Sequence, residues 1–318
     1  MANVLITGCA GFIGSSLAEN ILKNLSHFFV LGIDNLDNFY DKKNKIENVN
    51  RLKEYKRFKF YELDILNIHK LYSIEEKIDL CVHLAGRPGV LKSIENPNSY
   101  YENNLIGTSN ILNFLNAKKS RKIIFASSSS IYKCENNKPF TENKTKLQPL
   151  SPYGFSKMFC ENLLDNFHDN FGFDVVKLRL FSVYGPNMRP DLAIFKFTNL
   201  ILNNKSVNIF GNGMSSRDYT YIDDIVNGIF KSINFILNEK NICETLNLGN
   251  SSPVQLLKLI EMLSMKIEKK VNVINLPSNK CELISTFADI SKAKKLIDFK
   301  PNIDLNSGLD KFLEWHLK

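Results

Sequence analysis

Tyr153 and Lys157 stand four residues apart in a stretch with helical character, so their side chains point the same way. A free tyrosine has a pKa of about 10 and is a poor base at neutral pH. A neighbouring ammonium group favours the phenolate form, which can remove a proton from a hydroxyl group. Ser128 ends the preceding apolar strand and could hydrogen-bond the same substrate oxygen. Taken alone, this Tyr–Lys spacing is also common in surface pairs, so its meaning depends on the elements that position it.

The stretch Thr7–Gly14 supplies one such element. It follows the short apolar run Val4–Ile6 and opens a segment whose apolar residues recur every four positions. A buried strand, a glycine turn and a helix N-terminus together form a dinucleotide cradle. Gly8 permits the tight turn, Gly11 lets the backbone approach a pyrophosphate, and Gly14 lets the helix pack closely. The free N–H groups at the helix start then face the diphosphate.

Asp34 ends the second apolar run, about 20 residues after the glycine stretch. An acid at this place can accept hydrogen bonds from both ribose hydroxyls and would repel a 2′-phosphate, so NAD is favoured over NADP. The alternative is a loop aspartate that caps the turn with Asn35. Asp64, after the third strand, could hold the adenine amino group or cap the next helix. The nicotinamide end of the cofactor would lie near Tyr153. Its positive ring also favours the phenolate form of Tyr153, and Lys157 can hold the nicotinamide ribose.

The composition is that of a globular protein with a small anionic ligand. The chain has 318 residues, 44% of them hydrophobic and 23% charged. Its net charge of +8 comes from lysines spread along the chain, without a basic patch interleaved with aromatic residues, which argues against a nucleic-acid partner. No apolar run approaches membrane-spanning length and no signal peptide is evident. The six scattered cysteines predict free thiols, no zinc site and a reducing, cytoplasmic location.

Strand-like runs alternate with helix-like stretches as far as residue 180 or so, a pattern typical of an α/β fold with a Rossmann-type doubly wound parallel sheet. Beyond this point the alternation loosens. We therefore predict an NAD-binding domain over 1–178 and a smaller mixed α/β domain over 179–318, with an approximate boundary and the possibility of interleaved segments. No linker separates them, so the two parts should pack as one body.

At this point the chain resembles the extended short-chain dehydrogenases/reductases, and within them the NAD-dependent nucleotide-sugar epimerases. The resemblance covers nearly the whole chain. It rests on ordered motifs: Thr7–Gly14, Asp34-Asn35, Asp64-Ile65, His83–Gly86, Asn103–Thr108, Ser127–Tyr132, Tyr153–Lys157, Leu178–Phe181, Tyr184–Pro186, Arg217–Asp224 and Ala288–Ala293.

The resemblance implies roles for further residues. Ser128, four residues before Tyr132, takes the position of the catalytic hydroxyl beside Tyr153 and Lys157. Arg217 takes the position that binds the UDP pyrophosphate, and Glu282 stands where an aspartate usually accepts from the uridine ribose. The arginine that often precedes this acid is replaced by Asn279-Lys280-Cys281. The remaining implied contacts to the cofactor are Phe12, Ile13, Asn35, Asp64, Ile65, Leu84, Ala85, Gly86 and Asn104, and those to the substrate are Arg87, Ser129, Phe181 and Ser182.

The implied reaction is a transient oxidation at the sugar C4. Tyr153 removes the 4-OH proton while a hydride passes to the nicotinamide, the 4-keto sugar rotates, and the hydride returns to the other face. Gly185–Phe195 and Asp34–Asp41 resemble UDP-glucuronate 4-epimerases. In that case Arg189 could approach the sugar carboxylate, or it could only anchor its loop to Asp191. Thr286 is small at a position that is bulky in some UDP-glucose epimerases, which leaves room for an N-acetyl group.

We therefore rank UDP-glucuronate first, UDP-GlcNAc second and UDP-glucose third. One rival is a 4,6-dehydratase or decarboxylase on the same scaffold. Dehydratases of this family carry acidic residues just after the catalytic hydroxyl and decarboxylases usually have a glutamate near that point, whereas Ser129 and Ser130 stand here. A second rival is a non-catalytic NAD-binding protein, which need not keep hydroxyl, tyrosine and lysine together. The resemblance also implies a homodimer through helices near 97–118 and 153–171.

Overall fold

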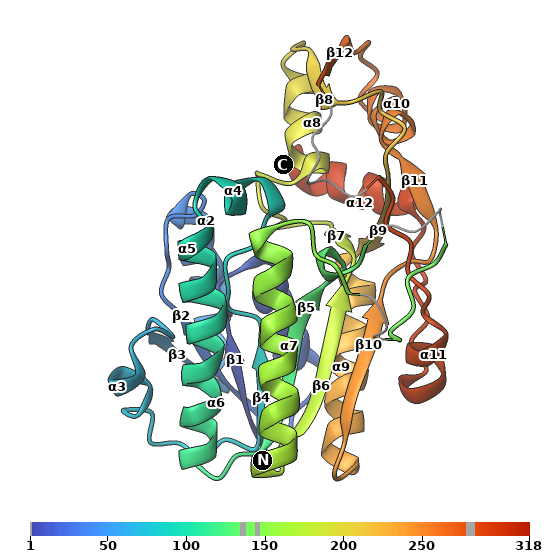
Figure 1. Ribbon diagram of the computed structural model, residues 1–318. Coiled ribbons are helices and arrows are strands. Elements are labelled where there is room, and N and C mark those ends of the chain that lie inside the picture. Colours follow the sequence, from blue (N-terminus) through green and yellow to red (C-terminus); the bar gives the residue numbers. More distant parts are fainter. Residues whose placement is uncertain (1, 134–137, 144–146, 278–283) are drawn as a thin grey trace.

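The computed structural model describes residues 2–133, 138–143, 147–277 and 284–318. Its centre is a seven-stranded sheet of order β10-β6-β5-β4-β1-β2-β3, in which every neighbouring pair is parallel (Figure 1). The strands are β1 (Ala2–Thr7), β2 (Phe28–Asp34), β3 (Phe58–Glu62), β4 (Leu80–His83), β5 (Lys122–Ser128), β6 (Asp174–Leu180) and β10 (Cys243–Leu248). The first six follow the order of a dinucleotide-binding sheet, which confirms the predicted fold class.

Helices cover both faces of this sheet, because its strands are apolar on both sides. On one face, α1 (Phe12–Asn24), α2 (Lys42–Lys53) and α9 (Ile222–Asn238) bury residues such as Leu17, Leu52 and Ile229. On the other face, α3 (Ile68–Leu71), α6 (Gly107–Ala117) and α7 (Pro152–Phe171) bury residues such as Leu71, Leu112 and Leu164. The doubly wound arrangement leaves the carboxyl ends of the strands open at one edge, where ligands bind in such folds.

The edge strand β10 differs from the prediction, which grouped its residues with the smaller domain. In the structure Cys243–Leu248 pairs in parallel with β6 in the central sheet, and α9 makes the crossover that parallel pairing needs. Leu246 and Leu248 are fully buried there. The second part of the chain therefore returns to complete the first, and a single domain boundary at residue 178 stays a prediction.

Most of the rest of the second part stands over the carboxyl edge of the sheet, at the top of Figure 1, whereas α11 (Ser291–Ile297) lies lower, against α9 and β10. Its strands are β7 (Ser182–Tyr184), β8 (Val207–Phe210), β9 (Ser216–Tyr221), β11 (Pro253–Gln255) and β12 (Val273–Leu276). They form a three-stranded sheet of order β11-β9-β7 and a two-stranded sheet of β12 with β8. The helices are α8 (Ala193–Leu202), α10 (Leu256–Ile267), α11 (Ser291–Ile297) and α12 (Leu305–His316). This mixed α/β unit closes over one side of the site.

The segment predicted as one helix from about residue 97 to 118 has three parts. They are α5 (Pro97–Tyr100), the π-helical turn η1 (Tyr101–Ile106) and α6, preceded by the short α4 (Val90–Glu95). A π-helical turn shifts the following residues around the helix axis and often marks a functional site. Here the turn carries Asn104, which is almost fully buried.

Within the described ranges, no helix combines the length and apolar character needed to cross a membrane. Over the same residues, no group of three or more His, Cys, Asp and Glu side chains is arranged to hold a metal ion.

Candidate active site

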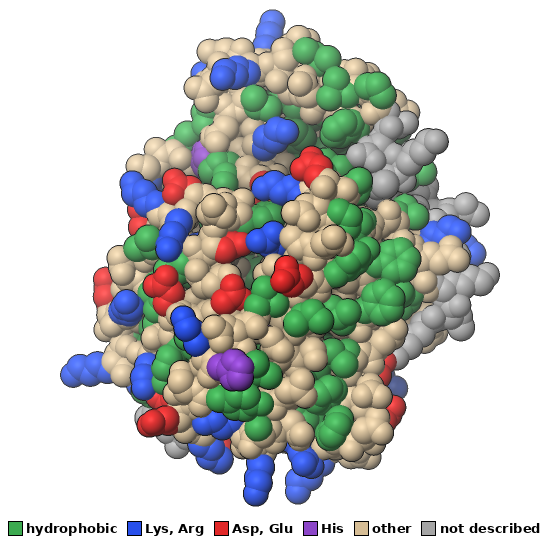
Figure 2. All heavy atoms as spheres, turned by 60° about the vertical axis from the view of Figure 1, so that its left-hand side comes forward, with side chains coloured by type: hydrophobic (Ala, Val, Ile, Leu, Met, Phe, Trp, Pro, Cys, Tyr) green, Lys and Arg blue, Asp and Glu red, His purple; other side chains and the backbone are tan. Residues whose placement is uncertain are grey.

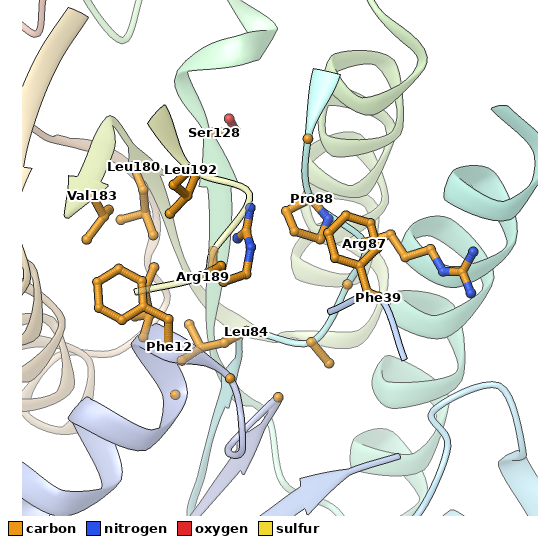
Figure 3. Close-up of a pocket in the computed structure, with 18 of the residues that line it drawn as sticks. Phe12, Phe39, Leu84, Arg87, Pro88, Ser128, Leu180, Val183, Arg189 and Leu192 are labelled. Carbon is orange, nitrogen blue, oxygen red and sulfur yellow. The ribbon is translucent and has the colours of Figure 1, made fainter. Parts of the chain in front are cut away.

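A cavity of about 480 Å³ opens at the carboxyl ends of β1, β2, β4, β5 and β6, below the smaller part (Figure 3). Most of the predicted site residues line this one cavity, which we call the cleft. These residues are Gly8, Gly11, Phe12, Ile13, Gly14, Asp34, Asn35, Ile65, Leu84, Ala85, Gly86, Arg87, Ser128, Ser129, Tyr153, Lys157, Phe181, Ser182, Arg189 and Arg217. The fold therefore brings together residues that are up to 209 positions apart (217 less 8).

Three predicted residues of the described part do not line the cleft. Asp64 accepts from the amide of Asn35 at 2.9 Å and from Leu66 N at 2.8 Å, so it holds a turn behind the wall. Asn104 bonds both backbone groups of Arg87 and the Ser156 hydroxyl. Thr286 is buried and accepts from Asp218 N at 3.1 Å. Glu282 lies outside the described residues.

The glycine stretch has the shape of a cradle for a pyrophosphate. Gly8 has φ +71°, and a Cβ there would lie 2.8 Å from Ala85 N. A Cβ on Gly14 would lie 2.1 Å from the Gly8 carbonyl oxygen, so α1 packs directly on the glycine turn. No side chain caps the first turn of α1, whose residues Gly11–Gly14 face the cleft. Uncapped N–H groups at a close backbone approach fit a dinucleotide diphosphate.

Asp34 ties the end of β2 to the glycine turn. Its carboxylate accepts from Ala10 N at 3.1 Å and from Leu36 N at 2.9 Å, so the turn-capping alternative is present in the structure. Burial raises the pKa of Asp34, against the opposing charge of Lys45. The carboxylate also lines the cleft, and each oxygen keeps capacity for a further hydrogen bond. Turn capping and ribose binding are therefore compatible.

The proposed reactive groups come from α7 and the end of β5. Ser151 caps α7 by accepting from Gly154 N at 3.1 Å, which starts the helix that carries Tyr153 and Lys157 into the cleft. Lys157 is 5% exposed, and its ammonium donates to Ala126 O at 2.8 Å above the Phe125 ring. Ser128 accepts from Ser130 N at 3.1 Å, which fixes its side chain at the strand end. Lys157 keeps further N–H donors for a ligand.

His83 supports the cleft from behind. Its Nε2 lies 3.0 Å from Thr108 Oγ1, which donates to Asn104 O at 2.5 Å. Its Nδ1 lies 2.6 Å from Thr7 Oγ1, which accepts from Ala85 N at 3.2 Å. These partners assign the proton to Nε2 and make Nδ1 the acceptor. Burial, with a smaller contribution from the Lys157 charge, lowers the pKa of His83 to about 3.

This low pKa predicts acid sensitivity of the fold. Between pH 6.5 and 3 the unfolded chain binds a proton at His83 and the folded chain does not, so stability is full above about pH 6.5 and falls as the pH drops. The slope should be about 1.4 kcal/mol per pH unit. Urea unfolding of wild type and His83→Asn between pH 5 and 8 measures the difference. Parallel stability curves would contradict the assignment of this slope to His83.

Arg189 stands between the walls of the cleft. Figure 3 shows it between Leu180, Val183 and Leu192 on one side and Pro88 and Phe39 on the other. Its Nε and Nη2 donate to Asp191 at 2.9 and 3.0 Å, so the predicted alternative of a loop anchor is observed. Burial alone would raise the pKa of Asp191, but the Arg189 fork holds it below its usual range. Asp191 is therefore ionised near pH 7.

The sequence reading missed one wall of the cleft. Phe39 lies beneath the ammonium of Lys92, 3.9 Å from ring centroid to Nζ, and faces the Arg189 guanidinium. Lys45 is buried and donates to Asp37 Oδ1 at 2.7 Å, close to Asp34. Nothing in the spacing of the residues around Phe39 and Lys45 marks which of these side chains turn inward. Cation–π and ion-pair contacts of this kind depend on loop geometry, not on a sequence period.

Known proteins are similar to this chain over nearly its whole length. The family model described as GDP-mannose 4,6 dehydratase matches residues 5–312. A UDP-glucuronate 4-epimerase from Thermodesulfobacterium geofontis is 40% identical, over 99% of this chain and 96% of the relative.

Solved structures show the same architecture. The UDP-glucuronic acid 4-epimerase from Bacillus cereus, crystallised with UDP-glucuronic acid and NAD, superposes with a TM-score of 0.92 at 36% identity, over 99% of this chain and 100% of that one. The UDP-glucose 4-epimerase from Thermotoga maritima, with UDP-glucose, gives a TM-score of 0.88 at 29% identity, covering 99% and 98%.

Proposed function

This chain belongs to the extended short-chain dehydrogenases/reductases that the GDP-mannose 4,6 dehydratase model describes, and we propose that it is an NAD-dependent UDP-glucuronate 4-epimerase. The observation that carries the proposal is the meeting, in one cleft, of the Tyr153–Lys157 pair, the glycine cradle and Arg189. NAD binds the cradle and takes up, then returns, the hydride of the sugar C4. A cofactor regenerated in each cycle can stay bound throughout.

Each of these side chains has its own role in this proposal. Tyr153, as phenolate, takes the proton of the sugar 4-hydroxyl and later gives a proton back to the same oxygen. Lys157 favours the phenolate and holds ribose hydroxyls of the cofactor with the N–H groups that Ala126 leaves available. Ser128 donates its hydroxyl hydrogen to the sugar O4. Arg217, a lining residue from β9, binds the diphosphate of the substrate.

The chemistry of the cleft favours epimerisation over dehydration. Elimination of water needs an acid and a base beyond the group that oxidises C4. Among the described lining residues the only carboxylates are Asp34 and Asp37, at the end where the adenosine would bind. Ser129 and Ser130, beside Ser128, also line the cleft. The epimerase function therefore agrees with both the motifs and the geometry.

The direct test is incubation of the protein with UDP-glucuronate, UDP-GlcNAc and UDP-glucose, followed by NMR of the products. We expect UDP-galacturonate from the first and the highest kcat/KM with that substrate. Loss of water or CO2 in place of C4 inversion would overturn the epimerase function, and a preference for UDP-GlcNAc or UDP-glucose would change the substrate. Absence of turnover with all three sugars, despite NAD binding, would favour a non-catalytic role.

We also propose that the protein is a homodimer through the flank that α7 and η1 form. Exposed apolar side chains gather there, toward the right of Figure 2, with Ile106 51% and Phe159 46% exposed. Tyr101 and Phe155 extend this surface. Contiguous apolar patches of this kind mark interaction sites. A second copy fits, because a two-fold axis would pack each α7 against its equivalent.

The double substitution Phe155→Ser with Phe159→Ser should break this dimer, because each removes a large apolar contact from the patch. Sedimentation should then give the 36.4 kDa monomer, against twice that mass for the wild type. Met265→Ser, which removes an even more exposed apolar side chain from α10, is the control and should stay dimeric. A wild-type monomer at micromolar concentration would refute the proposal.

We propose a cytoplasmic location on the evidence of the thiols. Cys9, Cys81 and Cys160 are buried and form no disulfide. Free thiols are typical of reducing compartments.

A further inference from the structure

A buried ion pair lies beneath the cleft, between α7 and β6. Arg179 is 0% exposed and Glu161 is 2% exposed. Arg179 Nη2 donates to Glu161 Oε2 at 2.7 Å, and its Nε donates to Oε1 at 3.0 Å, so the guanidinium grips the carboxylate with two bonds. This fork geometry fixes the relative orientation of the two side chains, which a single contact would not do.

The pair is joined to the reactive groups on two sides. Ser127, next to Ser128, donates to Glu161 Oε1 at 2.6 Å. Its Cα is the register partner of Arg179 in the neighbouring strand. Glu161 itself lies on α7, four residues after Lys157 and eight after Tyr153. One carboxylate therefore ties the strand end that carries Ser128 to the helix that carries Tyr153 and Lys157.

A third connection runs to the segments beyond the strand. Arg179 Nη1 donates to the Tyr132 hydroxyl at 2.8 Å, and this hydroxyl donates to Asn247 Oδ1 at 2.7 Å. The Asn247 amide donates to Phe140 O at 2.7 Å and to Asp289 O at 3.1 Å. Tyr132 closes the short helix η2 (Ser129–Ile131) that Ser128 caps. The turn after Ser128 is thus held at both of its ends.

Stability alone does not explain a charged pair at this place. Taking two charges out of water is costly, and well-packed apolar residues in place of a buried pair are often as stable or more stable. What apolar residues cannot supply is direction, since their contacts are not oriented. Hydrogen bonds to three different elements do supply it.

We propose that Glu161, Arg179 and Ser127 are positioning residues, which set the placement of Ser128 relative to Tyr153 and Lys157. The proposal rests on the epimerase function and concerns the geometry of the same site. None of the three side chains has to touch the reacting atoms. Because a misplacement of about 1 Å can cost about 100-fold in rate, a small shift of the strand end should be measurable as a loss of kcat.

The first test is Ser127→Ala, which cuts the link between the strand end and the pair. Glu161 Oε1 keeps its bond from Arg179, so no buried charge loses its partner and the protein should fold. We expect kcat for UDP-glucuronate to fall about tenfold or more, with KM little changed, as when an interaction made only in the transition state is lost. With substrate deuterated at C4, the isotope effect on kcat of Ser127→Ala should be larger than that of the wild type. Ser127→Thr, which keeps the hydroxyl donor, should restore turnover.

Ser232→Ala is the matched control. Ser232 is fully buried in α9 and donates to Gly228 O at 2.9 Å, away from the cleft. It should cost a comparable amount of thermal stability and leave kcat unchanged. If both serine variants lower the Tm alike and neither lowers kcat, the positioning role is wrong.

The double substitution Glu161→Met with Arg179→Met separates position from stability. Each single change would leave a buried charge unpaired and could prevent folding, whereas the double change removes both charges. We expect a Tm close to that of the wild type and a kcat that stays at least about tenfold lower. A stable double variant with normal kcat would overturn the positioning role. A wild type that does not epimerise UDP-glucuronate would instead overturn the proposed epimerase function.

Discussion

Tyr153→Phe should lower the turnover of UDP-glucuronate by about 100- to 10,000-fold, the range that general acid–base catalysis contributes. The substitution removes the only group proposed to take the proton of the sugar 4-hydroxyl. It leaves the ring in place against Tyr100, at 6.2 Å between centroids, and leaves the Lys157 bond to Ala126 intact. NAD content, measured after denaturing the purified protein, should therefore stay at the wild-type level.

The matched control is Tyr100→Phe. This phenol lies next to Tyr153, but it donates to Pro88 O at 2.7 Å, and burial raises the pKa of Tyr100 to about 12. It remains protonated at neutral pH and is unsuited to act as the base. Turnover should fall far less in this variant than in Tyr153→Phe. Near-normal turnover of Tyr153→Phe, or equal losses in the two variants, would remove Tyr153 from its proposed role.

The parts of the site that the sequence predicted are those encoded over short distances. The turn between β1 and α1 needs Gly8 and Gly14 for steric reasons that act within seven residues. The Tyr153–Lys157 spacing acts within one helical turn. The place of Asp34 in the site was predicted from its position at the end of β2, the strand next to β1 in the sheet. Each of these features has a period, a turn or a fixed spacing, and all of their residues line the cleft.

The parts that the sequence did not predict depend on contacts between distant segments. Tyr132 and Asn247 are 115 positions apart and meet only because β10 joins the edge of the central sheet. Nothing in the spacing of Ser127, Glu161 and Arg179 marks them as a cluster, since strand register and helix packing together bring them into contact. The wall formed by Phe39 is set by a loop without regular structure.

Arg189 illustrates a third case, in which the sequence offered two roles and the structure contains one of them. Its bidentate bond to Asp191 fixes the loop. The same guanidinium faces the cleft, where its Nη1 group can still donate to a ligand. An arginine held by a neighbouring carboxylate is pre-oriented, so less side-chain entropy is lost when it binds a second anion. The loop anchor therefore does not compete with the proposed carboxylate contact.

Arg189→Met should consequently affect an acidic sugar far more than a neutral one. Loss of a buried, charge-assisted contact costs about 2–5 kcal/mol, so kcat/KM for UDP-glucuronate should fall at least about 30-fold. With UDP-glucose, which has no carboxylate, kcat/KM should change by no more than the loop rearrangement causes. Steady-state assays with both substrates, at one ionic strength, give the ratio of the two losses.

The removal of Arg189 also leaves Asp191 without its partner, and its charge would repel an anionic sugar on its own. The double substitution Arg189→Met with Asp191→Asn removes this repulsion, while Asp191→Asn alone keeps the arginine and loosens only its anchor. We expect the double variant, like Arg189→Met, to lose most of the preference for UDP-glucuronate over UDP-glucose. Asp191→Asn alone should retain most of the wild-type preference for UDP-glucuronate. Equal losses for both sugars in every variant would mean that Arg189 serves the loop alone. The choice of sugar would then have to come from other residues at the sugar end of the cleft, such as Ser129 and Ser182.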